Sequence, residues 1–245
     1  KIALDKLLAD KVVSVQPWIS GLQEGLRGSA SPEDLETLFQ LVYLYGTAPR
    51  ADTTAFAAYR AWMRGILENR SASPEAAFGD TLQVVLAQHH FRSRPWSKAL
   101  IGEMDLMTSY RIYQERFADF GDFTFIIVGN FALAEIEPLV RRYLGSLPSA
   151  GREESWRDVG IEPPKGLVER YVYKGLEAKS QTRMVFTGPF DWNYRDFFTI
   201  HAVADVLQIR LREVLREELG GTYSVGVGAA TTHYPRETYS LSISF

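Results

Sequence analysis

The chain has 245 residues, of which 46% are hydrophobic and 23% charged, and its formal net charge is −3. This composition is typical of a folded globular protein, and the charge gives no electrostatic reason to expect nucleic acid or an anionic membrane as a partner. The lack of cysteine excludes disulfides, thiol catalysis and cysteine-based metal sites within the chain. No apolar run approaches the ~18 residues of a membrane-spanning helix.

The first part of the chain is predicted to be a hairpin followed by helices. Residues 12–26 read as strand, turn and strand. Ser31 and Pro32 form a strong helix start, because serine caps a helix and proline suits its first position. The spacing of apolar residues then predicts four helices, at about 32–46, 52–68, 75–88 and 104–117.

The middle of the chain is predicted to contain strands and the main domain boundary. Residues 123–131, FTFIIVGNF, form an apolar run too short for a helix and are predicted to be a strand. A helix is expected at 132–144. Residues 146–166 are polar and rich in proline and glycine, which is typical of a linker. We therefore expect a first domain at 1–150, a linker at 151–166 and a second domain at 167–245.

The second domain is organised around residues 193–227. The apolar spacing predicts one long helix with Asn193 as its N-cap, and Gly220-Gly221 would end this helix by supplying positive φ. Alternation from Tyr223 onward predicts a strand directly after the glycines. Further strands are expected at 168–173, 182–187 and 239–245.

The order of the elements favours an α+β fold. Helices and strands are mixed but do not alternate strictly, which favours antiparallel sheets packed by helices over a doubly wound parallel sheet. The strands after residue 167 resemble the opening of the first domain, so we expect tandem related units. The chain begins at Lys1 and ends on an alternating strand pattern, so we expect a fragment with an incomplete second unit.

The sequence contains no motif for a zinc site of its own. The four histidines are His89, His90, His201 and His233, and none has a second histidine at the spacing of H-x-x-E-H or H-E-x-x-H. The chain also lacks the G-x-S-x-G nucleophile elbow and the glycine-rich phosphate loops. We therefore expect no metal bound by this segment and no peptide cleavage by it alone.

Arg216 and Tyr223 are the candidate substrate-binding residues. A helix, turn and strand would aim both side chains at one point, where arginine can hold a carbonyl or carboxylate and tyrosine can donate to an oxyanion. The structural alternative is that Arg216 pairs with neighbouring glutamates and Tyr223 packs at a sheet edge. Arg212 lies four residues before Arg216, which costs like-charge repulsion on an isolated helix face.

The loop at 89–96, HHFRSRPW, is a second candidate. Its structural interpretation is that Phe91 and Trp96 cover a core edge while Arg92 and Arg94 meet acids; contact with substrate is the alternative. Asp52, Glu68 and Asn69 read more simply as helix caps and surface than as ligands.

The segment LREELGGTYSVGV at 215–227 resembles the Arg/Tyr segment in the C-terminal half of the pitrilysin/insulinase family of zinc metallopeptidases. Arg216 and Tyr223 stand at the family's seven-residue separation. Three further segments resemble the PqqL-like bacterial periplasmic branch of this family: residues 24–52, the FTFIIVGNF run and the segment WRDVGIEPPKG. The resemblance implies that residues 1–150 are a third-type domain and 167–245 part of a fourth-type domain.

The resemblance also implies a function. Family members close two halves around a chamber, and the zinc lies in the N-terminal half, so this chain would be the C-terminal, non-zinc half. Its partners would be that N-terminal half and a peptide substrate, with the zinc in the parent protein and the bacterial periplasm or cell envelope as its location. Arg216 would orient the peptide and Tyr223 would stabilise the oxyanion. The alternative is a non-catalytic structural or assembly protein on the same fold, as in the core subunits of respiratory complex III.

Overall fold

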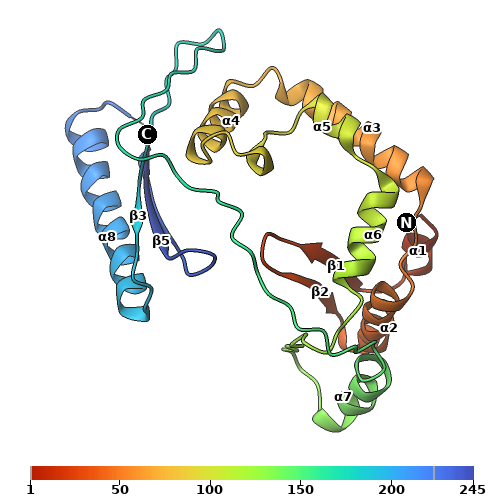
Figure 1. Ribbon diagram of the computed structural model, residues 1–245. Coiled ribbons are helices and arrows are strands. Elements are labelled where there is room, and N and C mark those ends of the chain that lie inside the picture. The colour runs from red at the N-terminus through yellow and green to blue at the C-terminus, as the bar shows by residue number, and fades with distance from the viewer. Residues whose placement is uncertain (1, 223) are drawn as a thin grey trace. The chain divides into compact units, whose positions relative to one another are not determined.

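The computed structural model describes residues 2–222 and 224–245, and not the side chains of residues 2 and 3 (Figure 1). The chain divides into two compact units. Unit 1 comprises residues 1–68 and 96–155, and unit 2 comprises residues 69–95 and 156–245. Each unit is therefore built from two separate stretches of sequence.

Unit 1 consists of a hairpin and a set of helices. The strands pair antiparallel, with Val13 opposite Ala30 and Ile19 opposite Glu24, so the predicted hairpin is confirmed. The last two residues of α3 are grouped with unit 2. The elements of unit 1 are α1 (Ile2–Leu7), β1 (Val13–Ile19), β2 (Glu24–Ala30), η1 (Pro32–Asp34), α2 (Leu35–Thr47), α3 (Thr53–Arg70), α5 (Lys98–Glu103), α6 (Leu106–Arg116), α7 (Leu133–Leu139) and η3 (Val140–Leu144).

Two apolar clusters hold unit 1 together. Ile101, on the short helix α5 that the sequence did not predict, is fully buried against Met63 and Leu67 of α3. The second cluster joins Phe117 and Phe120, after α6, to other buried and half-buried side chains of the hairpin, α2 and η3. The first cluster holds α5 against α3 and the second holds α6 against α2 and the hairpin, because buried apolar contacts dominate packing energy.

The strand predicted at 123–131 is wrong. Residues 123–128 have no regular secondary structure, and no strand ladder includes them in the described part of the chain. Ile126 is 83% exposed and Val128 is 92% exposed. An apolar run favours extended backbone locally, but a strand also needs a neighbour for its backbone N–H and C=O groups. The strand predicted at 168–173 is wrong for the same reason.

Unit 2 is a three-stranded antiparallel sheet with helices. The strand order is β3-β5-β4, with Val185 of β3 and Gly228 of β4 both opposite Ser242 of β5. Figure 1 shows α8 running beside this sheet. The elements of unit 2 are α4 (Pro74–Leu86), η2 (Phe91–Ser93), β3 (Arg183–Pro189), α8 (Tyr194–Arg212), η4 (Glu213–Glu218), β4 (Gly226–Thr232) and β5 (Thr238–Ser244).

Helix α8 is positioned by its start and by its contact with β4. Asn193 is its N-cap, as predicted, because the side-chain oxygen accepts from the N–H of Asp196 at 2.9 Å. Ala204 is buried, and the amide oxygen of Gln208 accepts from the N–H of Val227 in β4 at 3.2 Å. Helices packed on antiparallel sheets confirm the predicted α+β class; that the two halves of the chain are related units stays a prediction.

Candidate substrate-contacting sites

Arg216 lies on the widened last turn of the α8 helix. The sequence predicted an uninterrupted α-helix up to Gly220, but α8 ends at Arg212 and continues as the π-helical turn η4. The N–H of Leu219 donates to the oxygen of Val214 at 3.0 Å, a five-residue step in place of the usual four. The Arg216 side chain is exposed. π turns occur frequently at functional sites, and a role of Arg216 in substrate contact stays a prediction.

Tyr223, the other predicted substrate-binding residue, lies outside the described residues. Gly220 has φ +59, as expected for the residue that ends the helix. The strand predicted to follow directly from Tyr223 starts later, because β4 begins at Gly226. Thr222 donates its hydroxyl to the backbone oxygen of Ser224 at 3.0 Å.

The histidines have separate local contacts. His201 Nδ1 is 2.8 Å from the backbone oxygen of Phe197, and His233 Nδ1 is 2.7 Å from a carboxylate oxygen of Glu237. His90 Nδ1 accepts from the N–H of Arg92. Within residues 2–222 and 224–245, no three His, Cys, Asp or Glu side chains are grouped so as to hold a metal ion. The residues described here therefore do not fit a zinc site.

The aromatic loop at 89–96 is open to solvent. Phe91 is 64% exposed and Trp96 is 50% exposed, so the expectation that these rings cover a core edge is wrong. The Arg92 guanidinium lies 5.8 Å from the centre of the Phe91 ring. His89 has φ +60, a backbone conformation that few residues other than glycine adopt. A role for this loop in substrate contact stays a prediction.

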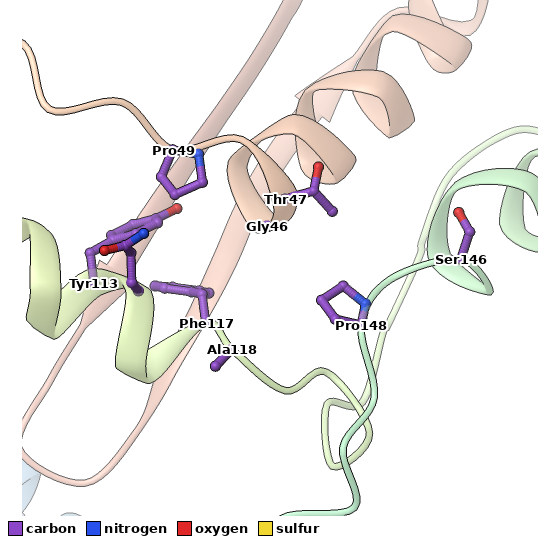
Figure 2. A pocket seen from close by; sticks show the side chains of 9 residues that line it. Gly46, Thr47, Pro49, Tyr113, Phe117, Ala118, Ser146 and Pro148 are labelled. Carbon is purple, nitrogen blue, oxygen red and sulfur yellow. The ribbon is translucent and has the colours of Figure 1, made fainter.

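Unit 1 contains a pocket that the sequence did not predict. Its volume is about 330 Å³, and it lies where the ends of α2 and α6 meet residues 146–148 (Figure 2). Tyr113 lines it and donates its hydroxyl to the backbone oxygen of Tyr45 at 2.9 Å. Burial raises the pKa of Tyr113 to about 12. The lining comes from three distant stretches of sequence, so no local motif marks it.

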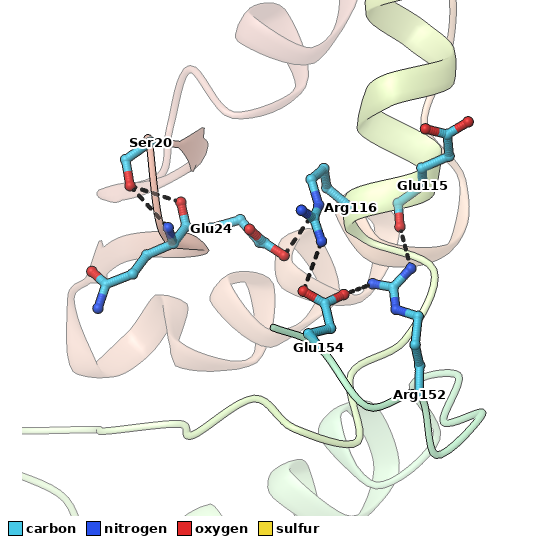
Figure 3. Close-up of polar contacts among 7 residues, drawn as sticks. Ser20, Glu24, Glu115, Arg116, Arg152 and Glu154 are labelled. Carbon is cyan, nitrogen blue, oxygen red and sulfur yellow. Dashed lines mark hydrogen bonds and ion pairs between the residues drawn. The ribbon is translucent and has the colours of Figure 1, made fainter. Parts of the chain in front are cut away.

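A charged cluster in unit 1 ties residues 152–154 to α6 and β2 (Figure 3). Arg116 contacts Glu154 at 2.7 Å and Glu24 at 3.4 Å, and Arg152 also pairs with Glu154. Arg152 donates to the backbone oxygen of Glu115 at 2.7 Å. Burial raises the pKa of Glu24, although the nearby Arg116 opposes this. These ion pairs connect three segments of unit 1.

Comparison with known proteins identifies the family. Residues 110–245, more than half of the chain, match the family model described as the peptidase M16 inactive domain. The chain belongs to this family. The resemblance that the sequence shows to the pitrilysin/insulinase (M16) peptidases is therefore confirmed.

Three relatives illustrate the similarity of this M16 inactive domain. It is 23% identical over 231 residues to the protein named "Probable zinc protease PqqL" of Haemophilus influenzae, covering 91% of the chain and 24% of that protein. Its fold matches the periplasmic protease PqqL of Escherichia coli with a TM-score of 0.80 at 20% identity, over 99% of this chain and 27% of that one. It matches a peptidase M16 inactive domain from Pseudomonas fluorescens with a TM-score of 0.62 at 15% identity, over 95% and 57%.

The chain spans about a quarter of the length of the two PqqL proteins. Among the residues that the structure describes, no helix combines the length and the apolarity that crossing a bilayer requires. The similarity establishes the family and the fold.

Proposed function

We propose that this M16 inactive domain completes the substrate chamber of a zinc-dependent endopeptidase. The observation that carries the proposal is that nearly the whole chain has the fold of a quarter of the periplasmic protease PqqL of Escherichia coli. The family description, "inactive domain", fits a chain whose described residues hold no metal-binding group. The zinc would be held by a partner segment, the N-terminal half, and would supply an activated water.

In this proposal residues 1–150 and 167–245 are related α+β domains of the third and fourth type, joined by the linker 151–166. The antiparallel hairpin β1-β2 in the first range and the antiparallel sheet β3-β5-β4 in the second support such a relation. Each unit would contribute part of the chamber wall, and the peptide substrate would lie against it.

Arg216 and Tyr223 would contact the peptide. Arg216 is exposed on the π turn, and a guanidinium can bond a peptide carbonyl or carboxylate. Tyr223 would donate its hydroxyl to the oxyanion that forms when water attacks the peptide bond. Arg216 lies seven residues before Tyr223, the separation found in the family.

The test is peptide cleavage by a protein that joins this chain to its zinc-carrying half. The variants are Arg216→Ala and Tyr223→Phe, with Arg210→Ala as the control because Arg210 is an exposed residue on the same helix paired with Glu213. Losing an oxyanion donor lowers kcat by roughly 10²–10³. We expect a drop of that size for Tyr223→Phe, a drop for Arg216→Ala and no change for Arg210→Ala, at equal zinc content.

Unchanged cleavage by both site variants would show that the pair is structural. The second candidate function is a non-catalytic structural or assembly role on the same fold, which the word "inactive" in the family description favours. Absence of cleavage by the wild-type protein, with zinc bound and the fold intact, would support that function.

A further inference from the structure

Unit 2 contains a cavity of about 420 Å³ between α4 and the sheet β3-β5-β4. Its volume lies within the range of roughly 300–1,000 Å³ that is common for small-molecule binding pockets. It involves neither Arg216 nor the aromatic loop at 89–96. The residues around it come from α4, from Pro163 and from all three strands.

The sheet side of the cavity is lined by small and hydroxyl-bearing residues. Alternate residues of a strand point to the same face, and the register places the rows Val185, Ser242, Gly228 and Thr187, Ser240, Ala230 across the three strands. This face therefore offers hydroxyl groups and, at Gly228 and Ala230, space for a ligand to approach the backbone.

The opposite wall is apolar and held in place. Leu82 and Leu86 are four residues apart on α4 and so share one helix face, and Pro163 lies beside them at the cavity. The side chain of Gln88, just after α4, donates to the backbone oxygens of Glu162 at 3.1 Å and Pro163 at 3.3 Å. These bonds connect the end of α4 to the segment that carries Pro163.

Among the described residues that line the cavity, Arg183 is the charged one. It begins β3 and lines the cavity, and its guanidinium lies 3.4 Å from the hydroxyl of Ser242. The described residues that line the cavity include no Asp or Glu. A guanidinium has five N–H donors in a planar fork that matches the two oxygens of a carboxylate. The cavity thus combines a carboxylate-binding cation, an aliphatic wall and hydroxyl groups.

We propose that this cavity binds the free C-terminal residue of a peptide whose last side chain is apolar. The terminal carboxylate pairs with Arg183, the side chain packs against Leu82 and Leu86, and the serine hydroxyls bond the last peptide group. The proposal rests on the proposed function in one respect, since a chamber that receives peptides supplies this ligand. It names a substrate class: peptides anchored by an apolar C-terminus.

The test is direct binding to the 245-residue chain, measured by fluorescence anisotropy. The probe is the peptide Gly-Gly-Ala-Leu with a fluorophore on its N-terminus, either with a free C-terminal carboxylate or as the C-terminal amide. We expect the free acid to bind and the amide to bind at least about tenfold more weakly, because a hydrogen-bonded charge pair is lost.

Two variants locate the binding. Arg183→Gln removes the cation. It is expected to weaken binding of the free-acid peptide about tenfold or more, to the level at which wild type binds the amide. Gly228→Val narrows the cavity; its added Cβ would lie 3.7 Å from the Ser242 hydroxyl, an ordinary contact. Arg195→Gln, an exposed arginine on α8 that does not line the cavity, is the control and is expected to bind as wild type.

Equal binding of acid and amide, or full binding by Arg183→Gln, would overturn the proposal. The absence of peptide binding would also overturn it. So would displacement of the labelled peptide by octanoate at a lower concentration than by unlabelled peptide, because that result would indicate a fatty acid site. If Gly228→Val does not fold, peptide binding by Arg183→Gln alone tests the proposal. The assay needs no zinc-carrying segment, so its failure is distinguishable from failure of the cleavage test.

Discussion

The guanidinium of Arg116 at the end of α6 donates to the carboxylate of Glu154 across 2.7 Å. The same arginine lies 3.4 Å from Glu24 at the start of β2, so one cation joins three segments of unit 1. This pair is partly shielded, with side-chain exposures of 38% and 25%. It therefore differs from the many exposed pairs elsewhere, whose contribution to stability is small.

This arrangement predicts a measurable coupling between Arg116 and Glu154. In a double-mutant cycle with Arg116→Gln and Glu154→Gln, we expect a coupling free energy of about 1 kcal/mol, at the upper end for pairs that water still reaches. The matched control is Arg111 and Glu115 on α6, which are both more than 60% exposed. Urea unfolding should give a smaller coupling of about 0.3–0.5 kcal/mol for that pair.

Tyr113→Phe tests the wall of the unit 1 pocket. The substitution removes the hydroxyl that bonds the oxygen of Tyr45 and leaves that acceptor without this donor. We expect a loss of about 0.5–1.5 kcal/mol in the free energy of unfolding, measured in urea at neutral pH. Tyr59→Phe, on an exposed ring of α3, is the control and should change stability little. An unchanged stability of Tyr113→Phe would mean that water replaces the bond.

The raised pKa of Tyr113 also predicts an alkaline effect. Its pKa in the folded state is about 12, above the ordinary value of 10.0, because burial disfavours the phenolate. A raised pKa means that the stabilisation is present below the ordinary pKa and is lost as the pH rises through the folded value. Difference absorbance of wild type minus Tyr113→Phe should therefore show one tyrosine ionising well above pH 10. A normal titration would contradict the assigned burial.

Asp119 is expected to stabilise unit 1 at neutral pH and to lose this effect in acid. It is buried and accepts from the N–H groups of Arg152 at 2.6 Å and Gly121 at 2.8 Å. These backbone bonds lower its pKa below the ordinary 3.8. A lowered pKa means that the stabilisation is present above the ordinary value and disappears as the pH falls through the folded value.

Asp119→Asn should accordingly lower the Tm at pH 7, because the amide cannot accept both bonds as a carboxylate does. The difference from wild type should shrink as the pH drops below about 4, because the carboxyl is protonated first in the unfolded state and, at lower pH, in the folded state. A Tm difference that is constant with pH would indicate that the shape of the Asp119 side chain, and not its charge, stabilises unit 1. Thermal unfolding followed by circular dichroism across this pH range makes the measurement.

The cap of α8 gives a further prediction. Asn193→Ala removes the bond to the N–H of Asp196 and should cost roughly 0.5–2 kcal/mol, whereas Asn193→Ser retains an N-cap oxygen and should cost less. Hydrogen exchange of the first turn of α8 would show whether the loss is local. Equal effects of the two substitutions would exclude capping as the cause.

Local signals predicted much of this fold. Helices α2, α3, α4 and α6 lie within a few residues of their predicted ranges, and Asn193 caps α8 as its side chain suggests. Apolar spacing and caps act over one or two turns, so a sequence reveals them directly. The strand predicted at 123–131 shows the limit of this reasoning, since pairing depends on residues far away in the chain.

The candidate sites, too, could be predicted from the sequence only where local spacing determines them. The position of Arg216 near the helix end follows from spacing, but the π turn from Glu213 to Glu218 has no signal in the apolar spacing. The cavity around Arg183 was not predicted, because residues more than a hundred positions apart line it. Only the three-dimensional register reveals which side chains share that face.

The order in which the chain builds its two units limits how they can be separated. The chain changes unit after residues 68, 95 and 155, so neither unit is a continuous stretch. A single cut near 155 would leave α4, with Leu82 and Leu86, attached to the wrong piece, while Arg183 and the sheet went with the other. Neither unit can therefore be exchanged between proteins as one continuous segment. Recombination within this family would preserve the cavity only where residues 69–95 and 156–245 come from the same parent.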